Sequence, residues 1–515
     1  MTYRLADEPR RHALERPDAP ALTGRGSSLT YAELDQRTNR LANELAQRGI
    51  GPQARVAVLD RSSVQVVEVL FASAKVGAVT VPVNWRLTAG ELAEVLDDCE
   101  AQILFYDSTF GDTVAQLRTQ VPSLTQFVVI DGEEDSDYEA LIAAADDTDP
   151  GWVGDEDDIV LQLYTSGTTA KPKGVLSSNR NLGACTRSGG PWGFHSSSVS
   201  LCAMPLFHIG GLGFALVGIA YGAHNIIVRD FTPESLLDTF EQYRITNTFL
   251  VPSVIGMMVE VPGAATRDFT ALRSIAYGSS PITPALLKRA LATFGRPLFQ
   301  VYGLTETHGA ITQLDADDHT TAGDRVHLLR SVGKPYPWVE LRIVRPYSTE
   351  PADIDESGEI CVRSPQNTVG YFHRPEETAK AIDNDGWFHT GDVGRFDQDG
   401  YLFITDRIKD MIITGGENVY PIEVESVIAD YPGVSQVAVI GVPDPVWGEA
   451  VKAVVIAAPG QTIEPLDLMT FARDRLAGYK CPKSIDITNA LPLGATGKIL
   501  KRELRNQYAQ QVSTS

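Results

Sequence analysis

Cysteine is scarce in this sequence, with five residues among 515. The cysteines stand far apart, in none of the spacings that are typical of zinc sites or disulfide frameworks. This argues against a small secreted scaffold held together by disulfides. We expect them to be small buried core residues of a protein in a reducing compartment: Cys99, Cys185, Cys202, Cys361 and Cys481.

A hydrophobic run long enough to cross a membrane is also missing. The longest apolar stretch, Leu212–Val228, is broken by Gly218, Gly222, His224 and Asn225. It is better explained as a core helix that leads into a strand than as a membrane span. The N-terminal segment, Met1–Pro20, carries charges of both signs, unlike a signal peptide. We therefore expect a cytoplasmic enzyme without a transmembrane segment.

Basic residues are fewer than acidic ones: the sequence has 44 Lys and Arg against 66 Asp and Glu, which gives a net charge of −22. Such an excess argues against a nucleic-acid backbone as the main partner. It does not exclude a nucleotide, since a basic pocket can lie on an acidic surface. A homo-oligomer stays open, because one sequence does not reveal the oligomeric state.

The alternation of elements predicts the fold class. A chain of 515 residues is too long for one hydrophobic core, so two or more domains are expected. Strand-like runs and amphipathic helices alternate from about residue 30 to 300, which predicts α/β architecture with largely parallel sheets. Thr30 and Glu33 form a capping-box signature before a clear helix, Tyr31–Arg48. Further helices are expected at 62–76, 88–98 and 285–294, and strands at 55–60, 103–107, 127–131, 159–163, 225–230, 248–251, 274–277 and 298–302.

The pattern changes after about Ser331. Short strands at 340–344, 358–363 and 401–405 predict a small β-rich subdomain. After Arg407 we expect strands at 411–414, 437–440 and 450–457, and helices after Pro421, at 466–476 and at 499–507. The acidic run 131–158 is expected to be a weakly specified surface junction. The predicted organisation is a large N-terminal domain, 1–407, of stacked α/β subdomains plus a β-rich subdomain, and a small mobile α+β C-terminal domain, 408–515.

The most informative motif is Tyr164-Thr-Ser-Gly-Thr-Thr-Ala-Lys-Pro-Lys-Gly-Val175, which follows a strand-like run. Small residues let backbone N–H groups approach an anion, and hydroxyls and ammonium groups add donors. This chemistry suits the phosphates of a nucleotide. Pro172 between the two lysines predicts a flexible loop rather than a helix start. The alternative is a solvated hairpin turn.

Four other segments carry weaker signals. In Tyr302-Gly-Leu-Thr-Glu306, an aromatic face suits stacking on a base, and Glu306 suits Mg²⁺. In Gly386-Trp-Phe-His-Thr-Gly-Asp392, an acidic residue on a tight turn can accept hydrogen bonds from ribose hydroxyls. The segment from Arg407 to Pro421 is charged and contains Gly415-Gly416. Pro492-Leu-Gly-Ala-Thr-Gly-Lys498 places a lysine on a glycine loop, where it can act as a mobile point charge. Taken singly, each is explained as well by a strand end, a turn or a solvated surface.

Together, and in this order, the segments resemble the adenylate-forming superfamily, which includes acyl-CoA synthetases, aryl-CoA ligases and peptide-synthetase adenylation domains. The resemblance covers nearly the whole chain, from Tyr31 to Lys498. It implies that a carboxylic acid reacts with ATP to give an acyl-adenylate, and that a thiol, usually coenzyme A, then displaces AMP. The partners are thus a small carboxylic acid, ATP with Mg²⁺, and coenzyme A.

The resemblance also implies roles for single residues. By this resemblance, the residues expected to hold the β- and γ-phosphates are Thr165, Ser166, Gly167, Thr168, Thr169 and Lys173. Tyr302, beside Gly303, is expected to stack on adenine, and Thr305 is expected to contact the reacting phosphate. Glu306 is to bind Mg²⁺, and Asp392 and Arg407 are to hold the ribose. Lys498 is to bridge the carboxylate and the α-phosphate.

Thioester formation requires a second geometry. In the family the C-terminal domain rotates, and the hinge position matches Lys409. The rotation is expected to withdraw Lys498 from the acyl-adenylate and to bring the segment with Gly415, Gly416 and Glu417 to it. The thiol is to arrive beside His208, although a plain core histidine is the alternative for that residue. Where many relatives have Gly-Gly-Ala-Pro, this chain has Gly278 followed by Ser279, Ser280 and Pro281, which polarises the floor of the acyl and adenine pockets.

The leading hypothesis is an AMP-forming acid–CoA ligase, because the segment Met411–Pro421 resembles fatty-acyl and aryl-CoA ligases and no carrier domain is attached. One competitor is an enzyme that loads a carrier-protein phosphopantetheine, and another is a non-catalytic nucleotide sensor. The acid is not readable, although the expected pocket walls are mostly apolar or small, which suits an aliphatic chain or a cinnamate-like ring. These walls are Phe207, His208, Val251, Ser253, Ala276, Gly278 and Gly303.

Overall fold

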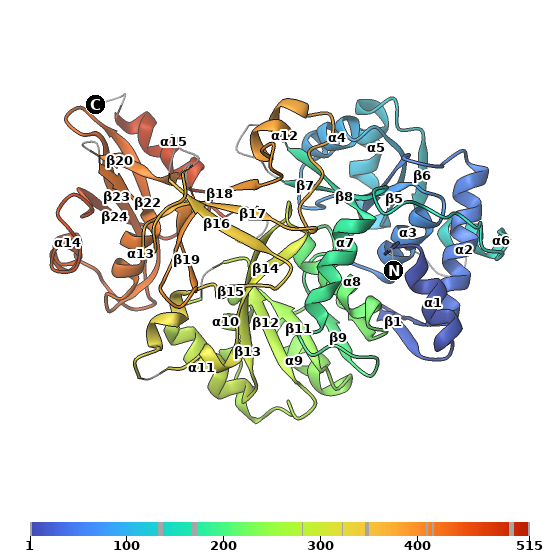
Figure 1. The fold of residues 1–515 in the computed structure, drawn as a ribbon, viewed down its shortest axis with the longest axis horizontal. Coiled ribbons are helices and arrows are strands. Elements are labelled where there is room, and N and C mark those ends of the chain that lie inside the picture. Colours follow the sequence, from blue (N-terminus) through green and yellow to red (C-terminus); the bar gives the residue numbers. More distant parts are fainter. Residues whose placement is uncertain are drawn as a thin grey trace. The chain divides into compact units, whose positions relative to one another are not determined.

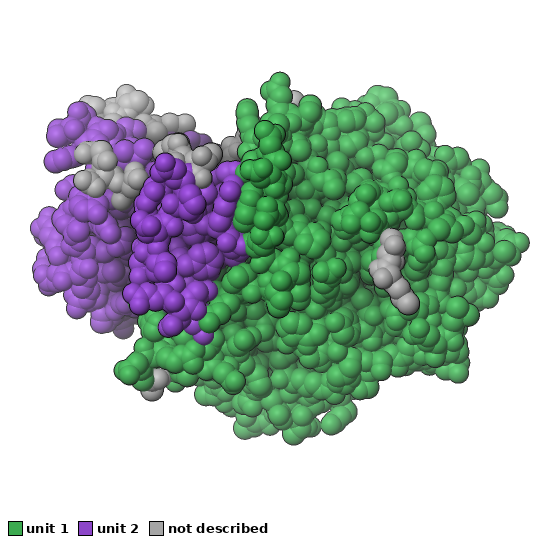
Figure 2. Space-filling model, in the orientation of Figure 1, with its two compact units in different colours: residues 1–340, 362–388 green, residues 341–361, 389–515 purple. Residues whose placement is uncertain are grey.

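The computed structural model describes residues 3–512 apart from 132–136, 166–171, 281, 322, 346–349, 408–409, 415–416 and 494–498. The chain divides into two compact units (Figure 2). The first unit comprises residues 1–340 and 362–388, and the second comprises 341–361 and 389–515. The predicted domain boundary between residues 407 and 408 stays a prediction.

The first unit contains a six-stranded sheet in the order β6-β5-β3-β4-β7-β8 (Figure 1). All neighbours are parallel except the last pair, which forms an antiparallel hairpin. The strands are β3 (Arg55–Leu59), β4 (Val79–Pro82), β5 (Ala101–Tyr106), β6 (Gln126–Val129), β7 (Ile159–Thr165) and β8 (Lys173–Ser178).

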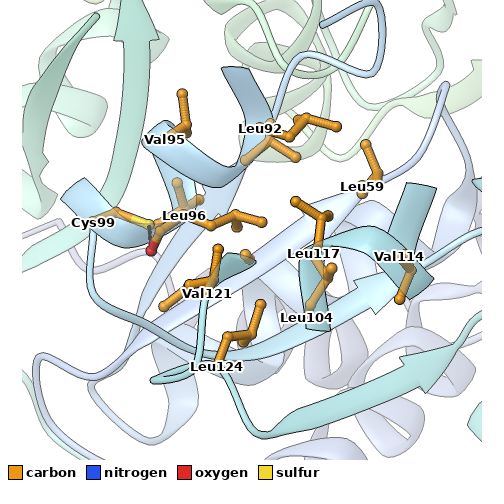
Figure 3. Close-up of a cluster of buried hydrophobic side chains, with 14 residues drawn as sticks. Leu59, Leu92, Val95, Leu96, Cys99, Leu104, Val114, Leu117, Val121 and Leu124 are labelled. Carbon is orange, nitrogen blue, oxygen red and sulfur yellow. Dashed lines mark hydrogen bonds between the residues drawn. The ribbon is translucent and has the colours of Figure 1, made fainter. Parts of the chain in front are cut away.

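Helices pack on this sheet or on one another around it. They are α2 (Tyr31–Gln47), α3 (Val64–Lys75), α4 (Ala89–Asp98), α5 (Gly111–Gln120) and α6 (Asp137–Ala144). The Thr30 hydroxyl accepts a hydrogen bond from the Glu33 N–H and the Glu33 carboxylate bonds back, so the predicted capping box is confirmed. Figure 3 shows Leu92 and Leu96 of α4 and Leu117 of α5 gathered over Leu104 of β5 in one buried cluster.

A nine-stranded sheet forms the other half of the first unit, in the order β15-β14-β13-β12-β11-β9-β10-β1-β2. Its central strands are parallel, and β2, β14 and β15 are antiparallel additions at the two edges. The strands are β1 (Pro20–Gly24), β2 (Ser27–Thr30), β9 (Val199–Cys202), β10 (His224–Ile227), β11 (Asn247–Leu250), β12 (Ser274–Gly278), β13 (Leu298–Leu304), β14 (Gly309–Leu314) and β15 (Lys334–Pro335).

The remaining helices of the first unit are α1 (Asp7–Glu15), α7 (Asn179–Thr186), α8 (Ile209–Ala220), α9 (Pro233–Gln242), α10 (Pro252–Val259), α11 (Pro284–Phe294) and α12 (Pro375–Ala381). The apolar stretch before Val228 forms the buried helix α8 and then strand β10, as predicted. In the part of the chain that the structure describes, no helix has both the length and the apolar character needed to cross a membrane. All five cysteines are buried, as predicted.

The second unit holds most of a four-stranded sheet, β16-β17-β18-β19, and a five-stranded sheet in which β24 pairs with β23 beside β21-β20-β23-β22. The first sheet comprises β16 (Glu340–Val344), β17 (Gly358–Arg363), β18 (Phe388–Phe396) and β19 (Leu402–Arg407). The second comprises β20 (Ile412–Thr414), β21 (Glu417–Val419), β22 (Val434–Asp444), β23 (Gly448–Ala457) and β24 (Ser484–Ile487). Its helices are α13 (Pro421–Ala429), α14 (Pro465–Arg473) and α15 (Lys501–Val512).

The predicted fold class is confirmed: α/β sheets form the large part of the chain, and a smaller α+β part ends it. Two segments differ from what was predicted for them, and several elements, among them α1, α5 and α9, were not predicted from the sequence. The acidic run after Asp131 contains the helix α6, which buries Tyr138 and Ile142. Asp392, which was predicted to lie on a tight turn, lies in strand β18, which begins at Phe388.

His308 generates a prediction about acid stability. Its side chain is fully buried, and burial lowers the pKa of the imidazole to about 4. As the pH falls, the His308 imidazole is therefore protonated near pH 6.5 in the unfolded chain but only near pH 4 in the folded chain. The contribution of neutral His308 to stability is complete above pH 6.5 and is lost as the pH falls towards 4, by about 1.4 kcal/mol per pH unit.

Urea unfolding of the wild type and of His308→Gln between pH 4 and pH 7.5 measures this contribution. We expect the wild-type free energy of unfolding to fall more steeply with acid than that of the variant. Parallel curves would show that His308 titrates normally in the folded chain.

Candidate active site

The predicted phosphate-binding motif lies in the β7–β8 hairpin. Thr165 at the end of β7 pairs with Lys173 at the start of β8. The two strands are antiparallel neighbours, and Lys173 begins a strand rather than a helix. The choice between a phosphate-binding loop and a solvated turn concerns residues 166–171, which lie outside the described residues. Ser166, Gly167, Thr168 and Thr169 lie outside the described residues, so their contacts with phosphate stay predictions.

The second motif forms the tight turn between β13 and β14. The register shifts between Tyr302 and Gly303, and a side chain at Gly303 would place its Cβ 1.8 Å from the Gly309 carbonyl oxygen. Only glycine therefore fits at this position. The Thr307 hydroxyl closes the turn, because it accepts from the Leu304 N–H and donates to the Gly309 carbonyl, both at 2.9 Å. This geometry leaves Thr305 and Glu306 half-buried at the tip.

Residues 364–372, here called the strap, join this turn to strand β8. The Thr368 N–H donates to the Glu306 carbonyl at 2.7 Å. Farther along, the Leu176 N–H donates to the Gly370 carbonyl at 3.0 Å, and the Phe372 N–H donates to the Gly174 carbonyl at 2.8 Å. The strap thus fixes the strand that follows the phosphate motif relative to the turn that carries Thr305 and Glu306.

Tyr371 of the strap contacts both predicted ligand groups. Its hydroxyl donates to Glu306 Oε1 at 3.1 Å, and the Lys173 ammonium lies 5.0 Å from the centre of its ring. Burial and the neighbouring Glu306 carboxylate raise the pKa of Tyr371, so its hydroxyl keeps its proton and donates. The sequence interpretation missed Tyr371. In the sequence, its only local signal was an aromatic residue after a glycine, Gly370. In the structure, this glycine has a φ of 139°.

Carboxylate oxygens at this turn fit a hard cation. Mg²⁺ prefers a carboxylate together with substrate phosphates, and the Glu306 carboxylate is half-buried and held on one oxygen by Tyr371. The fit supports the role predicted for Glu306, which stays a prediction.

Among the described residues, one group of three side chains has metal-ligand chemistry: Glu359, Cys361 and His389, with ligand atoms within 4.8 Å of one another. His389 Nδ1 lies 2.8 Å from Glu359 Oε2 and 3.5 Å from Cys361 Sγ. The other Glu359 oxygen accepts from the Gly391 N–H at 3.1 Å. These contacts anchor the backbone immediately before Asp392.

Asp392 is a correction to the predicted tight turn. It lies within strand β18 with 5% of its surface exposed, and it pairs across the sheet with Arg407 of β19. The glycine before it has a φ of 69°, which supplies the bend that the sequence suggested. The two residues predicted to hold ribose are therefore neighbours on adjacent strands, although the side chain of Arg407 lies outside the description.

The predicted pocket floor follows strand β12. A Cβ at Gly278 would lie 2.4 Å from the Val301 carbonyl oxygen, and Ser279 adopts a left-handed φ of 68°. This backbone turns the exposed Ser279 and Ser280 out of the sheet. Pro281 is not described. His208 occupies the N-cap position of α8, and its ring centre lies 4.2 Å from that of Phe207.

Arg86 adds a cation that the sequence interpretation did not find. Its guanidinium lies 4.4 Å from the ring centre of Trp85 and 5.7 Å from that of Phe207, a predicted pocket wall. No carboxylate pairs with it in the described part of the chain. Arg86 therefore offers a positive charge beside the expected thiol entrance.

The first unit thus brings together Lys173, Tyr302, Thr305 and Glu306, and it also contains His208 and Ser279. Asp392 and Arg407 belong to the second unit. Lys409, Gly415, Gly416 and Lys498 lie outside the described residues, as does the side chain of Glu417. Their roles in hinge motion, thioester formation and adenylation stay predictions.

Family models match nearly the whole chain. The model described as AMP-binding enzyme matches residues 9–372, and the model described as AMP-binding enzyme C-terminal domain matches residues 423–498. The first alone covers more than half of the chain.

Two similar proteins are 40% identical to this chain. One is the fatty acid–[acyl-carrier-protein] ligase ScoC of Streptomyces coeruleorubidus, aligned over 96% of this chain and 95% of that protein. The other is a feruloyl-CoA synthase of Amycolatopsis, aligned over 98% of this chain and 99% of that protein.

A solved structure supports the same assignment. ATP-bound MatB of Rhodopseudomonas palustris superposes with a TM-score of 0.91 at 32% identity and covers 99% of this chain and 100% of its own. The hairpin, the turn at Glu306 and these matches lead to one conclusion. The chain belongs to the AMP-binding enzyme family, the adenylate-forming superfamily that its motifs resemble, and it is an AMP-forming acid–thiol ligase.

Proposed function

We propose that this enzyme joins a fatty or aryl carboxylic acid to coenzyme A through an acyl-adenylate. The observation that carries the proposal is the contact of Tyr371 with both Lys173 and Glu306. Through this contact, the Lys173 ammonium and the Glu306 carboxylate lie on either side of one aromatic ring. This spacing suits a triphosphate held by a cation and by a metal ion bound to the carboxylate. Glu306 would hold Mg²⁺, which would supply positive charge against the phosphates.

Adenylation must overcome repulsion between two anions, the carboxylate of the acid and the α-phosphate. Lys173 supplies positive charge at the phosphate tail, and we assign Lys498 to the reacting centre. A charged donor aimed at charge that develops in the transition state contributes about 3–4 kcal/mol. Asp392 and Arg407 are assigned to ribose, because the backbone positions of a buried acid and an arginine pair across β18 and β19.

Substitution of Lys498 tests the proposed reaction. Lys498→Ala is expected to slow acid-dependent pyrophosphate release by about 100- to 1,000-fold, because it removes the bridging cation. Thioester formation from a supplied acyl-adenylate should continue. The assay uses a panel of short, medium, long and aromatic acids, and Lys288→Ala on the exposed face of α11 serves as the control. Equal loss of both steps would contradict the role given to Lys498, and no pyrophosphate release by the wild type with any acid would contradict the function.

Tyr371→Phe tests the contact that supports the proposal. The variant keeps the ring beside Lys173 and loses the hydrogen bond to Glu306. A hydrogen bond to a charged group is worth about 1.5–3 kcal/mol, so the Mg²⁺ concentration for half-maximal adenylation should rise at least roughly tenfold.

Tyr31→Phe is the matched control, because its buried hydroxyl donates to the Ala223 carbonyl, away from the proposed metal site. The control should lose thermal stability without any change in Mg²⁺ dependence. An unchanged Mg²⁺ requirement in Tyr371→Phe would remove Glu306 as the metal ligand.

The acceptor is the finer question. A carrier-protein ligase and a CoA synthase are equally identical to this chain, so relatedness alone does not choose between them. Arg86 favours coenzyme A, because it is an exposed cation near Phe207 with no described acidic partner. The nucleotide of coenzyme A carries more phosphates than the single phosphate of a carrier-bound arm.

Arg86→Ala is therefore expected to raise the KM for coenzyme A about tenfold, through loss of one charge-assisted contact. The KM for pantetheine, which lacks phosphates, should not change. Arg118→Ala is the matched control, because Arg118 also covers an aromatic ring, 3.8 Å from the centre of Phe127. A wild type that turns over a holo-carrier protein but not coenzyme A would establish the carrier-loading alternative.

The walls of the expected acyl pocket support an apolar acid. Phe207 and Ala276 are buried, and Gly278 and Gly303 are fixed as glycines by neighbouring carbonyls. None of these walls offers a charge for a second carboxylate. An aliphatic chain and a flat aromatic ring both fit this chemistry, and the acid panel decides between them.

A further inference from the structure

A buried hydrogen-bond chain crosses the elements that carry the proposed nucleotide contacts. His308, two residues after Glu306, is fully buried with a left-handed φ of 51°. Its Nδ1 lies 2.6 Å from the Gln366 carbonyl oxygen of the strap, and its Nε2 lies 2.6 Å from the Ser177 hydroxyl of β8. A non-glycine residue rarely adopts this backbone conformation unless its surroundings hold it there.

The partners fix the protonation of the ring. A carbonyl oxygen can only accept, so Nδ1 carries the proton and donates to Gln366. Nε2 is then an acceptor, and the Ser177 hydroxyl donates to it. Each ring nitrogen of His308 thus has one partner of the right kind, and a neutral imidazole satisfies both bonds.

The side chain of Gln366 makes further hydrogen bonds in this network. Its side-chain Nε2 donates to the carbonyls of Thr307 and Ala310, both at 3.1 Å. These residues flank His308, so the Gln366 backbone holds the ring and its side chain holds the turn. Trp338 Nε1 donates to Gln366 Oε1 at 2.5 Å and fixes the orientation of the amide.

We propose that Ser177, His308 and Gln366 form a positioning device for ATP, which sets strand β8 at a fixed distance from the turn of Thr305 and Glu306. Ser177 lies four residues after Lys173 on the same strand, so the device locates the cation at one end and the carboxylate at the other. His308 is a positioning residue and does not touch substrate. This inference rests on the proposed function, in which Lys173 and Glu306 share the triphosphate and its metal.

Directional bonds explain why polar groups are placed in this core. Apolar packing alone lets a strand slide by fractions of an ångström at little cost, whereas hydrogen bonds at both ring nitrogens fix distance and angle together. The backbone bonds of the strap hold Glu306 from one side, and the imidazole holds the same turn from β8. Two independent sets of hydrogen bonds, those of the strap and those of His308, therefore fix the separation of Lys173 and Glu306.

Substitutions at Ser177 test the device without touching a proposed ligand. Ser177→Ala removes the donor to His308, Ser177→Thr keeps a hydroxyl, and Ser177→Cys keeps a weaker donor of similar size. We expect the dissociation constant and the KM for ATP to rise roughly tenfold in Ser177→Ala, less in Ser177→Cys, and little in Ser177→Thr. The KM for the acid and for coenzyme A should stay unchanged.

Ser200→Ala is the matched control, because Ser200 is an equally buried serine on β9, outside the proposed contacts. Both alanine variants lose a buried hydroxyl, so both should lose thermal stability, but only Ser177→Ala should weaken ATP binding measured by calorimetry. Equal ATP affinity in the wild type and Ser177→Ala, or equal weakening in Ser200→Ala, overturns the proposal. Absence of ATP binding by the wild type would instead overturn the proposed function.

Discussion

The close approach of two backbone segments in the β13–β14 turn is the constraint on which the site depends. The Gly309 carbonyl occupies the space that any side chain at Gly303 would need, and the Thr307 hydroxyl spans the same gap. Because the turn is this tight, Thr305 and Glu306 emerge at its tip instead of continuing the sheet. The strap then bonds the Glu306 carbonyl and carries Tyr371 to the carboxylate. A rigid frame thus presents a charged group at a strand end, where α/β folds place their ligands.

The ring of Tyr371 lies between the ammonium of Lys173 and the carboxylate of Glu306. Lys173 lies over one part of Tyr371 and Glu306 accepts from its hydroxyl, so the ring is neutral matter between an ammonium and a carboxylate. The raised pKa of Tyr371 keeps the hydroxyl protonated, which holds the carboxylate without neutralising it. This arrangement suits a ligand that is itself a phosphate anion with a bound cation.

Local periodicity predicted helices such as α2 and α11, which carry apolar stripes and caps that are visible in the sequence. The helix α6 was missed because its acidic surroundings hid the two residues that it buries. Asp392 was assigned to a turn because glycine and aspartate favour turns, whereas pairing with β19 decided its structure. Tyr371 was invisible because its partner, Glu306, lies 65 residues away, and nothing in a single sequence reports such a contact. The motifs that resemble a family identified the chemistry, and the three-dimensional frame identified what holds it.

Buried polar groups in this frame are better explained by precision than by stability. Desolvation of an imidazole and a hydroxyl cancels much of what their hydrogen bonds contribute, so an apolar pair of similar volume would be about as stable. An apolar pair would not, however, select one separation between β8 and the Glu306 turn. The left-handed backbone of His308 points the same way, because a strained residue persists only where several contacts determine it. Catalysis by electrostatic positioning depends steeply on distance, whereas folding does not. The Ser177–His308–Gln366 chain therefore matters more for how the enzyme holds its nucleotide than for whether it folds.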